Sequence, residues 1–247
     1  MRRLFLDGAL SDTFSIGGPD AHHLLHVLRV KAGQHFVVVD ADGRTAEAEI
    51  TGCAADAVQL RRLADIAADT DSPVELVLAQ CLPKADKMDF IVQKAVELGA
   101  VSVQPLRSTN CVVKYDAAKA AARGQKWQRV ADEAAKQCGR TRRMTVEPLQ
   151  GLAEWLAAFD FSAAALLFCY ESEQRQGIRA CLQELQTRRF VLLIGPEGGF
   201  TPAEAEALIT AGAQSVTLGP RILRAETAAL AALSVVQYEK GDLGGVS

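Results

Sequence analysis

Long apolar runs are missing from this sequence. None approaches the roughly 20 residues that a membrane-spanning helix needs, although 49% of the 247 residues are hydrophobic. The basic start at residues 1–7 has no apolar core long enough for a signal peptide. We therefore expect a cytoplasmic protein with an ordinary buried core and no membrane association.

Cysteine and histidine are too scattered to suggest a metal site. No two of the six cysteines are closer than twelve residues, so the C-x-x-C spacing of zinc sites does not occur. All four histidines lie in the first 36 residues. The sequence thus predicts reduced, mostly buried thiols and no metal.

Positive charge is concentrated in the middle of an acidic chain. Residues 71–145 carry thirteen Lys/Arg against eight Asp/Glu, whereas the whole chain has a net charge of −3. Lys119, Arg123, Lys126 and Arg129 share one face of an expected helix. Such a surface suits a polyanion such as RNA. A merely solvated helix face is the alternative.

The first 70 residues predict a small β-rich domain. Strands are expected at 34–40, 45–50 and 55–61, with a hairpin turn at Asp42-Gly43 and a helix at 20–30. The polar segment 69–73 ends in proline, which places the domain boundary there and gives domains 1–70 and 71–247.

The second region alternates strands with helices, which predicts an α/β fold with a mainly parallel sheet covered by helices. Strands are expected at 74–79, 101–106, 163–170, 190–194 and 215–218. Helices are expected at 86–98, 117–138, 174–186, 202–211 and 226–238.

Two loops rich in glycine and proline follow the last two of these strands. The first is Gly195-Pro196-Glu197-Gly198-Gly199 and the second runs from Leu218 to Thr227. Ligands of parallel α/β sheets bind at the carboxyl ends of the strands. Both loops are therefore expected to form one ligand site.

The first loop is poorly suited to phosphate. It matches neither the G-x-G-x-x-G nor the P-loop pattern, and it has no lysine. Glu197 would face an anion, and Pro196 removes a backbone donor. A ligand that is neutral or cationic at this contact fits better, and S-adenosylmethionine is one such ligand, with Leu193, Leu218 and Leu223 available to pack its adenine.

The second loop places Arg221 and Arg224 close to Glu226 in the sequence. The arginines are candidates for a methionine carboxylate or an RNA phosphate. An ion pair between Arg224 and Glu226 is the alternative for that arginine. Thr227 is either a ligand contact or an ordinary residue of the following helix.

The chain resembles the ribosomal RNA small subunit methyltransferase E family. Six segments carry the resemblance in the family's order along nearly the whole chain: residues 2–5, 22–29, 84–99 (KADKMDFIVQKAVELG), 137–140, 192–200 (LLIGPEGGF) and 218–228 (LGPRILRAETA).

This resemblance implies a SPOUT-type parallel sheet with a C-terminal trefoil knot, preceded by a PUA-like β-barrel that binds RNA. It also implies a homodimer that uses S-adenosylmethionine to methylate N3 of a uridine in 16S rRNA of the 30S subunit. The cofactor residues expected by position are Leu193, Gly195, Pro196, Glu197, Gly198, Gly199, Leu218, Gly219, Arg221, Leu223, Arg224 and Thr227. The expected RNA contacts are Arg2, Arg3, His26, Arg29, Arg140 and Arg142.

For catalysis, Arg221 is the candidate stabiliser of charge developing on the uracil. Glu197 and Glu226 are candidate bases, with loop support as their alternative role. Two rival functions stay open: a SPOUT methyltransferase for another RNA target, and a non-catalytic RNA-binding ribosome assembly factor.

Overall fold

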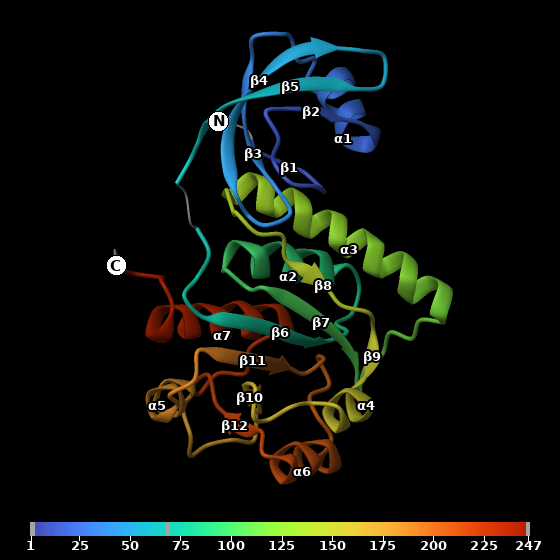
Figure 1. The fold of residues 1–247 in the computed structure, drawn as a ribbon. Coiled ribbons are helices and arrows are strands. Elements are labelled where there is room, and N and C mark those ends of the chain that lie inside the picture. Colours follow the sequence, from blue (N-terminus) through green and yellow to red (C-terminus); the bar gives the residue numbers. More distant parts are fainter. Residues whose placement is uncertain (1–2, 68–69, 246–247) are drawn as a thin grey trace. The chain divides into compact units, whose positions relative to one another are not determined.

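The computed structural model describes residues 3–67 and 70–245, drawn in colour in Figure 1. They form two compact units. The first unit comprises the chain up to Asp71 together with Ala135–Arg142, and the second comprises Ser72–Ala134 together with the chain from Arg143 onward. The end of one long helix and the turn after it thus belong with the N-terminal residues.

A five-stranded sheet forms the body of the first unit. Its order is β1-β3-β4-β5-β2, with β1 parallel to β3 and the other neighbours antiparallel. Ala46, Ala48 and Ile50 alternate along β4 and are fully buried in the core of this unit. The strands are β1 (Arg3–Phe5), β2 (Thr13–Ile16), β3 (His35–Val39), β4 (Thr45–Cys53) and β5 (Val58–Asp65).

The predicted hairpin is confirmed, because β3 and β4 pair on either side of Asp42-Gly43. Gly43 has φ 82°, in the left-handed region that favours glycine. The predicted helix at 20–30 is present as α1 (Gly18–His22), which continues into the π-helical turn η1 (His23–Val27). Arg29 then has φ 50°, so the chain has left the helix before Val30.

The second unit is built on a parallel sheet, as the alternation of elements predicted. The order is β12-β10-β11-β6-β7-β8, with β9 also paired to β7, and every pair is parallel. The strands are β6 (Glu75–Cys81), β7 (Ser102–Arg107), β8 (Thr145–Val146), β9 (Gln150–Gly151), β10 (Ala165–Cys169), β11 (Arg189–Ile194) and β12 (Gln214–Val216).

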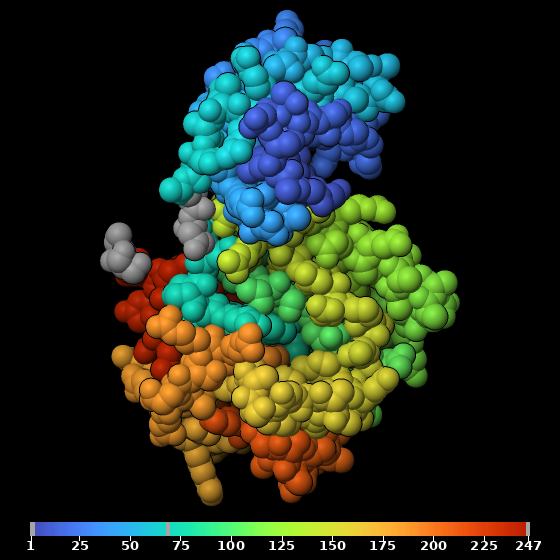
Figure 2. Space-filling model, in the orientation of Figure 1, coloured from blue at the N-terminus to red at the C-terminus, as the bar shows by residue number. Residues whose placement is uncertain are grey.

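Six helices accompany this sheet in the described part of the chain (Figure 1): α2 (Lys87–Glu97), α3 (Ala117–Cys138), α4 (Leu152–Ala157), α5 (Ile178–Glu184), α6 (Pro202–Ala211) and α7 (Ala225–Lys240). The terminal helix α7 packs against α2, α5 and β11. Figure 2 shows α6, in orange-red, beside the yellow region of α4 on the surface of the second unit, and the two helices are in contact.

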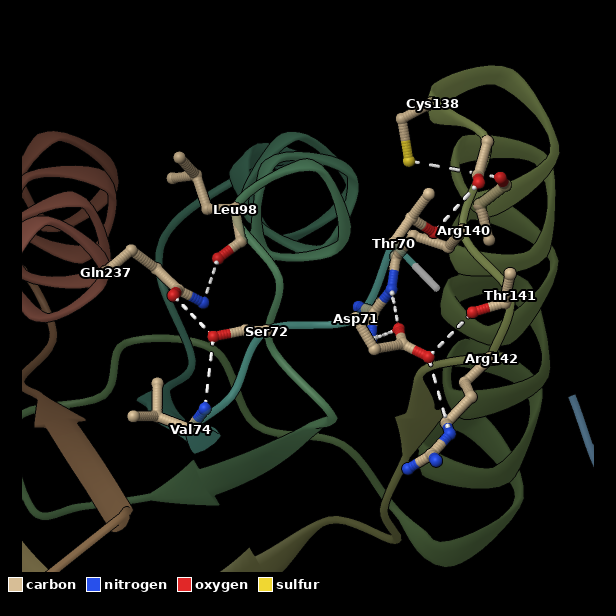
Figure 3. A network of polar contacts seen from close by, with 12 residues as sticks. Thr70, Asp71, Ser72, Val74, Leu98, Cys138, Arg140, Thr141, Arg142 and Gln237 are labelled. Carbon is tan, nitrogen blue, oxygen red and sulfur yellow. Dashed lines mark hydrogen bonds and ion pairs between the residues drawn. The ribbon is translucent and has the colours of Figure 1, made fainter. Parts of the chain in front are cut away.

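Polar contacts tie the start of the second unit to its last helix (Figure 3). The Ser72 hydroxyl donates to Gln237 Oε1 at 2.7 Å, and Gln237 Nε2 donates to the Leu98 carbonyl at 2.9 Å. Gln237 is buried, so its amide needs both partners. These bonds fix α7 against the C-terminal end of α2.

Candidate functional site: a pocket between two glycine-rich loops

Three loops meet at the carboxyl edge of the parallel sheet. Strand β10 lies between β12 and β11, so the ends of these three strands are neighbours. The loops that follow them line a pocket of about 300 Å³. That volume is at the small end of the range for ligand pockets.

Most of the predicted cofactor residues line this pocket. They are Gly195, Pro196, Glu197, Gly199, Leu218, Gly219, Arg221, Leu223 and Arg224. Leu193, Gly198 and Thr227 do not belong to its lining. Leu193 is fully buried in β11, and its neighbour Ile194 lines the pocket instead, because successive side chains of a strand point to opposite faces.

The first loop is packed too tightly for side chains. A Cβ on Gly199 would lie 2.8 Å from the Glu171 carboxylate, and one on Gly198 would lie 3.0 Å from Asn110 Cβ. Gly199 also has φ 65°, which disfavours other residues. The Asn110 amide holds the turn by donating to the carbonyls of Gly198 and Gly199 at 3.0 and 3.2 Å.

The start of α6 fixes the far end of the same loop. Thr201 and Glu204 form a capping box, and Glu204 Oε1 also accepts from the Thr109 backbone N–H at 2.8 Å. Phe200 is buried edge-to-face against Phe168 of β10, with ring centroids 5.9 Å apart. The loop is therefore rigidly placed between β11 and α6.

One lysine links the two loops through their carboxylates. Lys87 Nζ, at the start of α2, lies 2.9 Å from Glu197 Oε1 and 3.0 Å from Glu226 Oε2. The Lys84 backbone N–H also donates to Glu197. Glu226 therefore pairs with Lys87, and no ion pair with Arg224 forms among the described residues.

These contacts keep both carboxyls ionised. Burial opposes ionisation of Glu197, but the bonds from Lys87 and the Lys84 backbone lower its pKa below the ordinary value. Burial also opposes ionisation of Glu226, but its own backbone N–H and Lys87 lower the pKa of that carboxyl below the ordinary value. The same two carboxylates raise the pKa of Lys87. Loop support, rather than proton abstraction, is the role this arrangement favours for Glu197 and Glu226.

Several pocket residues were not predicted from the sequence. Cys169, Tyr170 and Glu171 come from the end of β10, and Val216 and Thr217 from the end of β12. Their position at the carboxyl ends of strands of a parallel sheet was the available signal. Nothing in the charge pattern marked Lys87 as the partner of two distant carboxylates.

The predicted RNA-binding residues differ in their exposure to solvent. His26 and Arg29 are exposed, and the His26 ring packs against that of His22 with centroids 4.6 Å apart. The Arg142 side chain is 70% exposed and lies 3.4 Å from Asp71. Arg2 lies outside the described residues.

Arg140 and Arg3 are instead part of the internal structure of the first unit. Arg140 is only 4% exposed and pairs with Asp71 at 3.1 Å, so it is not the exposed cation that the expected RNA contact requires (Figure 3). Asp71 also accepts from the Thr141 hydroxyl at 2.9 Å. Arg3 donates to the carbonyls of Gly139 and Arg140.

The basic face of α3 is partly neutralised. Arg123 lies 3.3 Å from Asp86, and Lys126 lies 2.5 Å from Asp89. The Lys119 ammonium lies 5.2 Å from the centre of the Tyr115 ring. Part of the positive charge of this stripe is therefore already paired within the chain.

Within residues 3–67 and 70–245, no cluster of three or more His, Cys, Asp or Glu side chains has a geometry that could hold a metal ion. No helix in that part of the chain is both long and apolar enough to span a membrane.

Comparison with known proteins agrees with the resemblance seen in the sequence. The RNA methyltransferase domain family matches residues 70–237, and the RNA methyltransferase PUA domain family matches residues 16–61. The ribosomal RNA small subunit methyltransferase E of Bacillus subtilis is 36% identical over 241 residues, which cover 94% of this chain and 93% of the relative.

Comparison with solved structures points to the same family. The ribosomal RNA small subunit methyltransferase E of Neisseria gonorrhoeae, bound to S-adenosyl methionine, is 34% identical with a TM-score of 0.88, covering 98% of this chain and 99% of its own. A putative methyltransferase of Legionella pneumophila, in complex with the same cofactor, is 28% identical with a TM-score of 0.88 and covers 98% of each chain. The chain therefore belongs to the ribosomal RNA small subunit methyltransferase E family of RNA methyltransferases.

Proposed function

We propose that the protein uses S-adenosylmethionine to methylate N3 of a uridine in 16S rRNA of the small ribosomal subunit. The observation that carries the proposal is the pocket between the two glycine-rich loops, in a chain whose relatives of known structure bind this cofactor. The cofactor supplies an electrophilic methyl group on its sulfonium.

The chemistry of the pocket fits this cofactor. Gly195 and Gly199 line the pocket with backbone alone, and Leu218 and Leu223 offer apolar surface for the adenine. Arg221 and Arg224 are exposed at the second loop, where they suit the methionine carboxylate or the RNA.

The chain's contribution to catalysis is positioning and electrostatics. N3 of uracil carries a proton, so negative charge develops on the ring as that proton leaves. Arg221 lines the pocket and is exposed, so it can stabilise a uracil carbonyl oxygen that takes up this charge. Glu197 and Glu226 keep the two loops in place through Lys87.

RNA binding is assigned to both parts of the chain. We place a PUA-like RNA-binding domain at 1–70 and the methyltransferase domain at 71–247, with the C-terminal trefoil knot that SPOUT enzymes have. His26, Arg29 and Arg142 are the exposed candidates for phosphate contacts. The 30S subunit, in the cytoplasm, is the proposed substrate.

A homodimer is also part of the proposal. Ile222 of the second loop is 90% exposed, and Tyr238 of α7 is 66% exposed. A second copy packed over these side chains would remove their apolar surface from water. Sedimentation should then give twice the mass of the chain.

Two measurements test the proposal against its rivals. Mass spectrometry of rRNA nucleosides from a strain lacking the gene should show loss of N3-methyluridine, whereas a change confined to tRNA or to a ribose methyl would favour another RNA target. Calorimetry should detect S-adenosylmethionine binding. Absence of binding would favour the non-catalytic assembly factor.

A further inference from the structure

One carboxylate at the pocket has no structural task. Glu171 lies two residues after β10 and lines the pocket together with Cys169 and Tyr170. Within residues 3–67 and 70–245, no hydrogen bond or ion pair engages its side chain. An ionised carboxylate is an acceptor only, so Glu171 is available to a ligand that brings donors.

The neighbouring carboxylates are all engaged. Glu197, the other acidic residue of the lining, is held by Lys87 and the Lys84 backbone. Glu173 accepts from the Ser215 hydroxyl and, at 2.7 Å, from the Arg175 backbone N–H. Glu204 belongs to the capping box of α6. By elimination, Glu171 is the carboxylate of this region that is free for a ligand.

Its position places it over the turn of the first loop. Glu171 Oε1 lies 2.8 Å from the point where a Cβ on Gly199 would be. That turn is the part of the loop where bare backbone faces the pocket. The carboxylate therefore lies over the Gly199 backbone, in the space that a side chain would fill, and adds acceptors to this side of the pocket.

The arginines indicate which part of the cofactor lies near Glu171. Arg221 and Arg224 both belong to the second loop; Arg221 is assigned to the uracil, and Arg224 is left to attract the methionine carboxylate. The α-ammonium is attached to the same carbon as that carboxylate, so the amino-acid end belongs with the second loop. The ribose, with two neighbouring hydroxyl donors, is left for the first loop and Glu171.

We propose that Glu171 is a specificity-determining residue that accepts hydrogen bonds from the ribose hydroxyls of the bound adenosyl group. This inference rests on the proposed function, because it presumes an adenosyl cofactor. A site built to bond a hydroxyl discriminates strongly against an analogue that lacks it. Acidic residues bind ribose hydroxyls in the same way in dinucleotide-binding folds.

Calorimetry with S-adenosylhomocysteine and its 2′,3′-dideoxyribose analogue tests the assignment. The wild-type protein should bind the parent at least about tenfold more tightly than the analogue. Glu171→Ala should lower the affinity for the parent ligand by about tenfold and bring the ratio of the affinities for the two ligands close to one. Glu171→Gln should give an intermediate loss. Glu206→Ala, an exposed glutamate of α6 outside the lining, should behave as wild type.

The outcomes distinguish a failure of the proposed function from a failure of the role of Glu171. No binding of either ligand by the wild type would contradict the proposed function itself. Binding of both, with the same ratio in wild type and Glu171→Ala, would overturn only the role of Glu171. A third ligand without the amino group completes the test: if Glu171→Ala removes discrimination against that ligand instead, the carboxylate binds the ammonium and the ribose assignment is wrong.

Discussion

Arg221 and Glu226, five residues apart on the second loop and the start of α7, have different surroundings. Glu226 is held by Lys87, whereas Arg221 is exposed at the pocket. The two residues can therefore be separated by experiment.

Arg221→Ala should lower kcat on 30S subunits by about 100-fold, the usual effect of removing one donor to a developing negative charge. The loss should appear in single-turnover methylation. Arg175→Ala, an exposed arginine outside the pocket lining, is the matched control. Wild-type turnover in Arg221→Ala would contradict the stabilising role.

Lys87→Met leaves two carboxylates without their shared cation, so the apparent melting temperature at pH 7 should fall by roughly 2–4 °C. In the wild type both carboxyl pKa values are below 4.5, so the stability they contribute is present at neutral pH and is lost as the pH falls through the lowered values. The wild type should therefore lose more stability than Lys87→Met below pH 4.5.

Thermal scans across the acid range check this prediction. Lys94→Met is the matched control, because Lys94 pairs with Glu97 at 2.8 Å on the same helix, and neither residue lines the pocket. Parallel pH profiles for wild type and Lys87→Met would show that the two carboxylates gain nothing from the lysine.

At the scale of elements, the first loop depends on backbone that only glycine tolerates. Gly199→Ala adds a Cβ 2.8 Å from a carboxylate at φ 65°. A non-glycine residue in this region costs about 1–2 kcal/mol, which corresponds to roughly 5- to 30-fold in cofactor affinity if the turn shifts to relieve it.

Titration of Gly199→Ala with S-adenosylmethionine measures that loss. Gly177→Ala is the control, because its φ of −73° is ordinary and its Cβ would meet nothing within 4 Å. Unchanged affinity in Gly199→Ala would mean that the turn does not shape the site.

The elements show what sequence patterns can and cannot predict. Helices α3 and α6 begin and end where the patterns placed them, since a long periodic face and a Thr-Pro start are strong local signals. Strands β8 and β9 have two residues each and were missed, because two residues have no period. Helix α4 has only six residues and was missed as well.

The candidate site was also predicted only in part from the sequence. The two loops were identified because glycine and proline mark unusual backbone at strand ends. Lys87 and Arg140 depend on contacts between residues 110 and 69 positions apart, and no local pattern encodes these. The sequence therefore did not show whether the charge of a given residue is free or paired in the folded protein.

For the whole molecule, the distribution of exposed positive charge should decide RNA affinity. Arg142→Ala removes an exposed cation, so RNA binding should weaken and the slope of log affinity against log salt should fall by about 1. Cofactor affinity should stay the same, because Arg142 is outside the pocket lining. An unchanged salt slope would contradict this assignment.

Arg140→Ala should behave differently, since it removes the buried partner of Asp71. Loss of one member of a buried pair costs about 3 kcal/mol, so the protein should melt at a lower temperature. Denaturant titration of the two variants side by side separates a surface role from a structural one.

The most direct measurement of the central claim is methylation of purified 30S subunits with labelled S-adenosylmethionine, followed by mapping of the labelled nucleotide. If the protein has the proposed activity, the label lies on N3 of one uridine in 16S rRNA and forms about 100-fold more slowly with Arg221→Ala. Label on another atom or another RNA, or no transfer by a protein that binds the cofactor, would contradict it.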